Sequence, residues 1–233
     1  MIQTHESNSH WWGKPVGIIT DPAWFAGSET ARNESLKQFA WVEFKALLTS
    51  APPAFELHAA GFALTDVQMG FRIALTQVPE SPSIADYDCR SATEEPFAIS
   101  ADEVRTFNHE RFLQLPGITD RMLNERYASW ANDIIHTHPQ WCLRLSHQGV
   151  TQGWFLSESS GGNLGLTLAM LSAQATISGQ HLYQRALHEY AKAGATIGHA
   201  SFSVRNTAVL NIYSHLGAKF TPPTGIWTWI RPA

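Results

Sequence analysis

Residues 164–179 read LGLTLAMLSAQATISG, an apolar run followed by a short turn. The run 164–171 predicts a buried strand, and residues 180–193 have the apolar spacing of a helix that ends at Gly194. The next expected strand, 196–204, should lie parallel to the first, because a crossover helix joins them. The turn then exposes backbone N–H groups at a helix N-terminus, where phosphate is favoured. By itself, this pattern is common to many strand–turn–helix units.

The remainder of the chain predicts an α/β or α+β fold in two parts. Beyond residue 96 the expected order is helix, helix, three strands, helix, strand, helix, strand. Segment 79–95 is polar, contains two prolines and has little periodicity, which indicates a linker. We therefore expect a smaller N-terminal domain over residues 1–78 and a larger domain over residues 96–233. Within the smaller domain, residues 11–20 are expected to form a strand.

Composition and charge exclude several classes of function. Charged residues make up only 15% of the 233 residues, and the net charge of −4 provides no field that attracts nucleic acid. The sequence has no basic region followed by an apolar core and no run of 18 apolar residues, so we expect a cytoplasmic protein without membrane insertion. Cys89 and Cys142 are too few for a disulfide scaffold. His136 and His138 lack further ligands nearby, and no metal site is expected.

Two motifs in the C-terminal half resemble those of the GNAT acetyltransferases. The family's pyrophosphate loop has the form Gln/Arg-x-x-Gly-x-Gly/Ala, and this chain has QATISG (174–179), with Ile177 in place of the middle glycine. The family's second motif is an Asn, then a helix ending Leu-Tyr-x-x-x-Gly-Phe, and here it runs from Asn206 through Tyr213 to Gly217. Both motifs have the family's order and spacing. The resemblance implies the GNAT fold, a mixed central sheet flanked by helices, with acetyl-CoA as acyl donor and cosubstrate.

The resemblance also assigns roles to residues of both motifs. The diphosphate of acetyl-CoA would lie against backbone N–H groups of the loop. These groups belong to Gln174, Ala175, Thr176, Ile177, Ser178, Gly179 and Gln180. The pantetheine arm would pair with the main chain of the preceding strand at Leu168, Ala169 and Met170. Ile177 can still donate its N–H, but its side chain could tilt the loop or weaken cofactor binding.

Tyr213 would be the general acid that protonates the departing thiolate, and Asn206 would contact the cofactor or order the start of its helix. Glu158 and His199 are the candidates for the base that takes the amine proton. Each residue has a plainer alternative: Tyr213 as a packed core aromatic, Asn206 as a helix cap, Gly179 as a close-packing residue, and the other two as ordinary polar residues.

The resemblance becomes narrower upstream. Four motifs are similar to those of TDP-fucosamine acetyltransferases, which N-acetylate a nucleotide-linked 4-amino-4,6-dideoxy sugar in cell-surface glycan assembly. They are Trp12-Gly-Lys-Pro-Val, Leu57-x-x-x-Gly61-Phe62, Arg111-Phe112 and Tyr127-x-x-Trp130. This similarity implies such a nucleotide-linked amino sugar as the acceptor, and it leaves the oligomeric state open, a homodimer included.

Two other classes of function remain open. One is a GNAT enzyme that acetylates another small-molecule or protein amine. The other is a non-catalytic acyl-CoA-binding module, which Ile177 allows and Tyr213 opposes. In the N-terminal half, residues 57–75 echo residues 212–230 in the order helix, glycine, aromatic, strand. A smaller, truncated GNAT-like domain at the N-terminus would produce that echo, and so would chance.

Overall fold

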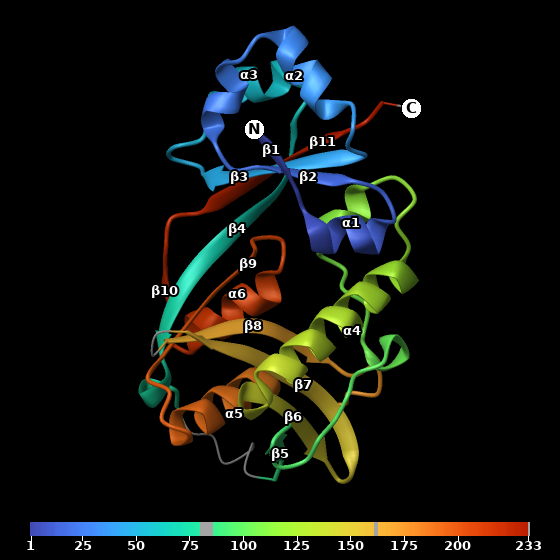
Figure 1. The fold of residues 1–233 in the computed structure, drawn as a ribbon. Helices are drawn as coiled ribbons and strands as arrows, with labels where there is room; N and C mark the ends of the chain where they lie inside the picture. The colour runs from blue at the N-terminus through green and yellow to red at the C-terminus, as the bar shows by residue number, and fades with distance from the viewer. Residues whose placement is uncertain (80–85, 161–162, 233) are drawn as a thin grey trace. The chain divides into compact units, whose positions relative to one another are not determined.

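The computed structural model describes residues 1–79, 86–160 and 163–232, which belong to two compact units (Figure 1). The first unit comprises Met1–Met69, Gln114–Pro116 and Pro222–Ala233. The second unit comprises Gly70–Leu113 and Gly117–Thr221. Each unit therefore includes segments that are far apart in the sequence.

The first unit is built on a sheet with the strand order β1-β2-β3-β11-β4. Its strands are β1 (Ile2–Thr4), β2 (Val16–Ile19), β3 (Trp41–Leu47), β11 (Thr224–Ile230) and the first part of β4 (Ala63–Ala74). Its helices are α1 (Glu6–Trp12), η1 (Pro22–Ala26), α2 (Glu29–Leu36) and α3 (Ala54–Ala59). Phe25 lies at the centre of its core, with its ring centroid 4.8 Å from Phe44 and 5.3 Å from Phe62.

The second unit has the strand order β4-β9-β8-β7-β6-β5, and β10 also pairs with β4. Its strands besides β4 are β5 (Asp88–Ser91), β6 (Cys142–His147), β7 (Val150–Ser160), β8 (Asn163–Leu171), β9 (Ile197–Ser203) and β10 (Lys219–Phe220). Its helices are α4 (Asp120–Thr137), α5 (Gly179–Lys192) and α6 (Thr207–His215). Among the described residues there are also short 3-10 turns: η2 (Leu75–Gln77), η4 (Ala101–Glu103), η6 (Pro139–Trp141) and η5 (Arg111–Gln114), whose last residue belongs to the first unit.

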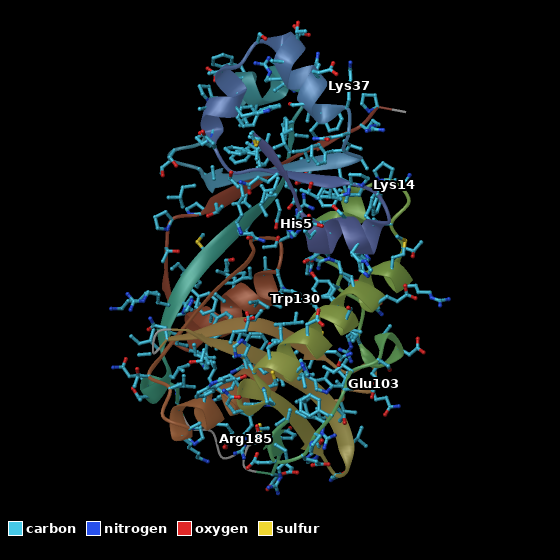
Figure 2. The ribbon with its side chains drawn as sticks, in the orientation of Figure 1. His5, Lys14, Lys37, Glu103, Trp130 and Arg185 are labelled. Carbon is cyan, nitrogen blue, oxygen red and sulfur yellow. The ribbon has the colours of Figure 1, made fainter. Side chains whose placement is uncertain are left out.

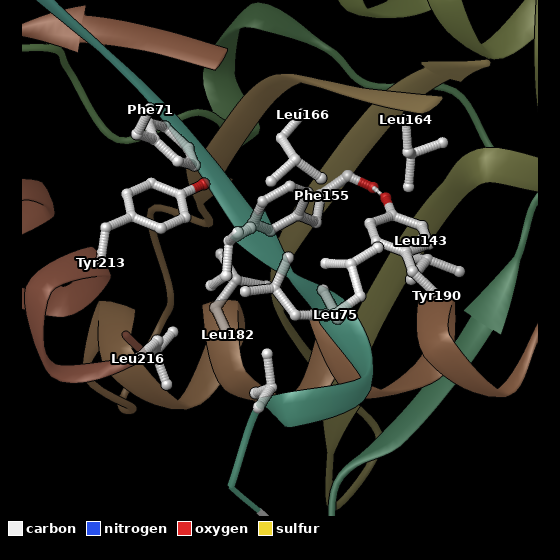
Figure 3. Close-up of a cluster of buried hydrophobic side chains, with 14 of the residues drawn as sticks. Phe71, Leu75, Leu143, Phe155, Leu164, Leu166, Leu182, Tyr190, Tyr213 and Leu216 are labelled. Atoms are coloured by element: carbon white, nitrogen blue, oxygen red, sulfur yellow. Dashed lines mark hydrogen bonds between the residues drawn. The ribbon is translucent and has the colours of Figure 1, made fainter. Parts of the chain in front are cut away.

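Two hydrophobic clusters cover the two faces of the second sheet. On one face, Leu182 of α5, Tyr213 of α6 and Leu216, the C-cap of α6, belong to a cluster that also contains Leu166 of β8 (Figure 3). On the other face, α4 packs against a cluster that contains Met170 of the same strand. The mixed sheet flanked by helices confirms the predicted fold class. Within the described residues, no helix is long and apolar enough to cross a membrane.

The prediction of a strand over residues 11–20 is wrong for its first part. Glu6–Trp12 forms α1, because His5 caps the helix by accepting the Asn8 N–H at 3.4 Å and Gly13 ends it with φ of 68°. Only Val16–Ile19 is strand.

The observed units also differ from the predicted domains 1–78 and 96–233. Within the predicted linker 79–95, residues 88–91 form β5, which pairs with β6, whereas residues 80–85 lie outside the described residues. The last strand, β11, pairs with β3 over seven positions and so belongs to the first unit. Residues 70–74 of β4 belong to the second unit. Local sequence patterns predict strands but not their partners, and the unit boundaries therefore differ from the predicted domain boundaries.

Candidate active site

Strands β8 and β9 separate shortly after they begin. In the part of the chain that the structure describes, they pair in parallel at two positions, Leu164 with Gly198 and Gly165 with His199. On its other side, β8 stays paired with β7 as far as Leu171. Within the described part of the chain, the β8 edge that faces away from β7 thus has no strand partner beyond Gly165. The predicted pantetheine-binding residues 168–170 lie on this open part of the strand.

A β-bulge marks the start of the opening. Between the pairs Leu156–Leu168 and Glu158–Gly165, β7 has one residue and β8 has two. The extra residue reverses the alternation of side chains along β8. Leu166 therefore packs in the cluster under α5 and α6, whereas Leu168 packs in the cluster under α4. Bulges of this kind are common beside active sites, where they end pairing or re-aim side chains.

Hydrogen bonds at the end of β8 show which main-chain groups face the opening. The Ser172 N–H donates to the Gln152 carbonyl at 2.9 Å, toward β7, while the Leu171 carbonyl accepts the Arg105 N–H at 3.1 Å on the opposite side. Because these directions alternate along a strand, the N–H and C=O of Ala169 also point away from β7. Its two neighbours in the predicted set direct theirs toward β7. Of the three predicted residues, Ala169 is thus the one able to pair with a ligand.

The loop that follows β8 is hydrogen-bonded to the buried side-chain amide of Gln152. Gln152 is only 1% exposed, and its Oε1 accepts the N–H groups of Thr176 at 2.8 Å and Ile177 at 3.3 Å. The Thr176 hydroxyl donates to the same oxygen at 3.1 Å. The N–H groups of Gln174 and Ala175 bond internally to Ser172. Four of the seven predicted diphosphate donors, residues 174–177, are therefore already occupied within the protein.

The other three predicted donors are free to face a ligand. Ser178 is the N-cap of α5, and Gly179 and Gln180 are its first two residues. Among the described residues, none accepts a hydrogen bond from their N–H groups. The positive end of the helix dipole lies at the same place. The guanidinium of Arg105 contacts the same loop three residues earlier, since it donates to the Ala175 carbonyl at 2.9 Å.

The glycine at position 179 is not required by the backbone. Its φ lies outside the left-handed region, and an added Cβ would approach Ile212 Cδ1 at 3.5 Å, an ordinary contact. The protein itself would therefore accept alanine at this position, and the close-packing role of Gly179 is weak.

Tyr213 is a buried member of the cluster under α5 and α6 (Figure 3). Its ring centroid lies 3.9 Å from Phe71, 5.2 Å from Tyr183 and 6.0 Å from Phe202 of β9. Burial raises the pKa of Tyr213 well above its ordinary value of 10, so the phenol is protonated at neutral pH. Its hydroxyl has no hydrogen-bond partner among the described residues. The packing role is confirmed, and the acid role stays a prediction.

Asn206 is the N-cap of α6. Its side-chain oxygen accepts the Val209 N–H at 3.2 Å, which confirms the predicted capping role. Contact between Asn206 and the cofactor stays a prediction.

The two candidate bases project from the face of the sheet opposite Tyr213. Glu158, Gly165 and His199 stand in register on three neighbouring strands, so they share a face. Gly165 between them has no side chain, and a Cβ there would lie 3.4 Å from the Glu158 carbonyl oxygen and 3.8 Å from the Thr167 hydroxyl. The Thr167 hydroxyl donates to the Glu158 carboxylate at 2.8 Å and fixes its position.

An open groove of about 520 Å³ lies beside His199. Its polar lining residues include Arg72, Asn163 and Thr221. Arg72 has no ion-pair partner within residues 1–79, 86–160 and 163–232. The groove therefore offers a cation and an imidazole to a polar ligand.

Sequence reasoning did not find Gln152 or Arg105. Gln152 reads as an ordinary polar residue of a strand, and Arg105 lies 70 residues before the loop that it contacts. The segment of Arg105 runs beside the end of β8, where the Glu103 carbonyl accepts the Ala173 N–H at 2.8 Å (Figure 2 labels Glu103). Among the described residues, no group of three or more His, Cys, Asp or Glu side chains is placed to hold a metal ion.

No protein-family model and no curated protein sequence matches this chain. Solved structures do match it. A GCN5-related N-acetyltransferase from Sphaerobacter thermophilus is 16% identical, covers 83% of this chain and 61% of its own, and has a TM-score of 0.55. A tandem GNAT protein from the clavulanic acid biosynthesis pathway is 13% identical, with 95% and 77% covered and a TM-score of 0.53.

A third similar structure is a GCN5-related glucosamine N-acetyltransferase region of a fungal multi-domain GH3 β-N-acetylglucosaminidase. It is 11% identical, covers 93% of this chain and 30% of its own, and has a TM-score of 0.56. The present chain spans only 61% of the length of the Sphaerobacter protein. At these identities the similarity concerns the fold alone. The chain has the fold of the GCN5-related N-acetyltransferases.

Proposed function

We propose that this protein transfers an acetyl group from acetyl-CoA to an amine. The observation that carries the proposal is the opening between β8 and β9, which begins at a bulge and presents the main chain of Ala169. The amides of a pantetheine arm can pair with such an edge as an added strand would. At the far end of β8, the diphosphate would meet the N–H groups of residues 178–180 and the guanidinium of Arg105.

In this proposal Tyr213 stabilises the sulfur that leaves. A thiol has an ordinary pKa of about 8.5, whereas burial holds the pKa of Tyr213 well above 10. Full transfer of the phenolic proton to a thiolate would therefore be uphill in the free protein. Tyr213 would act mainly by donating a hydrogen bond to the developing negative charge, a form of stabilisation that operates without complete proton transfer.

Glu158 is the base that we propose for the amine. It projects from the face opposite Tyr213, and the Thr167 hydroxyl orients its carboxylate from 2.8 Å. An amine above Gly165 would attack the thioester from that face, with its proton leaving toward the carboxylate or through water. His199, across Gly165 in the same register, is the second candidate.

For the acceptor we propose a nucleotide-linked amino-dideoxy sugar, with a thymidine-linked 4-amino-4,6-dideoxyhexose as the first choice. The upstream motifs of the sequence support this class. The groove beside His199 supports it as well, because Arg72 could pair with an anionic phosphate of the nucleotide. One similar structure is a glucosamine N-acetyltransferase region, so the fold accommodates amino sugars.

The test combines binding and turnover. Acetyl-CoA is titrated by calorimetry, and CoA release is then followed with a panel of nucleotide-linked amino sugars, an aminoglycoside and a peptide amine. The proposal predicts saturable binding and CoA release with the nucleotide-linked sugars. CoA release only with the aminoglycoside or the peptide would reject the nucleotide-linked sugar as acceptor but would still support an acetyltransferase. Binding without release for any amine would indicate a binding module, and absence of binding would reject the proposal entirely.

A further inference from the structure

Gln152 is a buried polar residue among apolar neighbours. It is almost completely buried on β7, beside the apolar residues Trp154 and Leu156 on the same strand. Its Nε2 donates to the Val150 carbonyl at 3.2 Å, and its Oε1 accepts three hydrogen bonds from the loop after β8. A buried amide is costly unless its bonds are made, so these bonds fix the loop relative to the sheet.

The loop is anchored a second time by the side chain of Ile177. This side chain packs against the hydrophobic cluster under α5 and α6, while the N–H of the same residue points to Gln152. Main chain and side chain are thus both held at the position where the related motif has a glycine. An isoleucine can occupy that position because its φ lies outside the left-handed region and its side chain has room in the cluster, while its N–H bonds to Gln152.

The outer side of the loop is held by Arg105. Its main-chain N–H bonds to the Leu171 carbonyl, and its guanidinium bonds to the Ala175 carbonyl, so it spans the end of β8 and the loop. Beyond the second attachment lie residues 178–180, whose N–H groups have no acceptor among the described residues.

We propose that Gln152 is a positioning residue for the acyl donor: it holds the loop in the conformation that directs the N–H groups of residues 178–180 at the CoA diphosphate. This inference rests on the proposed function. It predicts that loss of the Gln152 oxygen weakens the grip on the nucleotide end of CoA and leaves the chemistry at the thioester intact.

The experiment uses the Gln152→Met variant and two acyl donors. Met has nearly the same length as Gln but cannot accept the three hydrogen bonds. We expect KM for acetyl-CoA to rise at least tenfold, with kcat at saturation within twofold of the wild type. For S-acetylpantetheine, which has the same thioester and no diphosphate, kcat/KM should stay within twofold of the wild type.

The matched control is Gln184→Met. Gln184 is also a buried glutamine, but its amide donates to the Pro79 carbonyl and does not touch the loop. This variant should lose similar thermal stability and keep the wild-type KM for acetyl-CoA. Should Gln152→Met fail to fold, Gln152→Asn serves instead, since it keeps an amide but withdraws the oxygen by one methylene.

Three results would overturn the inference. They are an unchanged KM for acetyl-CoA in a folded Gln152 variant, an equal loss with both donors, and the same rise in KM in the Gln184 control. If the wild-type protein shows no binding of acetyl-CoA, the proposed function itself fails, which is a separate outcome.

Discussion

Replacement of Gly179 by proline removes one N–H from the proposed diphosphate site with little other change. Gly179 is the first residue of α5, the position at which proline is most readily accepted in a helix. The preceding Ser178 has φ of −74° and ψ of 154°, the extended conformation that a residue before proline prefers. The lost N–H has no partner within the described residues, so no internal hydrogen bond is broken. Alanine at the same position is the control, because it keeps the N–H and shares the 3.5 Å contact with Ile212.

The size of the effect follows from the charge of the ligand. A hydrogen bond to a charged group contributes about 1.5–3 kcal/mol, which corresponds to a loss of roughly 10-fold to 150-fold in affinity when it is removed. We expect Gly179→Pro to weaken CoA binding at least tenfold by calorimetry, and Gly179→Ala to change it by no more than about twofold. Both substitutions should alter the free energy of unfolding by about 1 kcal/mol or less, because the backbone already suits them.

Thermal denaturation monitors folding in each variant, and S-acetylpantetheine turnover monitors the thioester site. A folded Gly179→Pro protein that binds CoA as tightly as Gly179→Ala would refute the placement of the diphosphate at the start of α5. Equal weakening by both variants would instead indicate a steric effect of the added Cβ.

Three further predictions concern the other proposed residues. Tyr213→Phe should lower the single-turnover rate at least tenfold with little change in CoA affinity or melting temperature, and an unchanged rate would leave Tyr213 with a packing role alone. Because burial raises the pKa of Tyr213, ionisation of the phenol should not lower the wild-type rate below about pH 10. Glu158→Gln should lower kcat about 10²-fold or more at neutral pH and make the remaining rate rise with pH as the free amine fraction grows; an unchanged pH–rate profile would exclude Glu158 as the base. Arg105→Gln should weaken CoA binding about tenfold and make the affinity less dependent on salt, as measured by calorimetry at two salt concentrations. The control Arg121→Gln removes an exposed Arg121–Glu125 pair on α4 and should change neither quantity.

The parts of the fold that were predictable are those with strong local patterns. Residues 120–135 have the amphipathic spacing of a helix and form most of α4, where Leu123, Tyr127 and Ile134 recur on one buried side. The pair Gln148-Gly149 between two strand-like runs indicates a tight hairpin, and both residues adopt positive φ in the turn between β6 and β7, 50° and 78°.

Partner choice was beyond the sequence. The strand β5 is four residues long and mostly polar, so its sequence resembles a linker, and only its pairing with β6 makes it a strand. The helix–glycine–strand echo at Gly61 and Gly217 is real in the structure, because each glycine follows a helix and has φ of 80°. Yet β4 runs from the first unit into the second, and β11 belongs to the first unit whereas the helix α6 before it belongs to the second, which no local pattern indicates.

The candidate site divides in the same way. Asn206 was predictable as a cap, because that role depends on a residue three positions away. The loop before α5 was predictable as a backbone site, but not which of its N–H groups would stay free. Ser172 accepts the N–H groups of residues 174 and 175, and Gln152 accepts those of residues 176 and 177. Gln152 lies 24 residues before Thr176, and only the tertiary fold brings the two together.

A crystal structure of the protein with acetyl-CoA would show where the cofactor binds. We expect the pantetheine arm to pair with the main chain of Ala169 in the opening between β8 and β9, and the diphosphate to lie against the N–H groups of residues 178–180. Acetyl-CoA bound outside this opening, or with its diphosphate away from α5, would show that the proposed acyl-donor site is wrong.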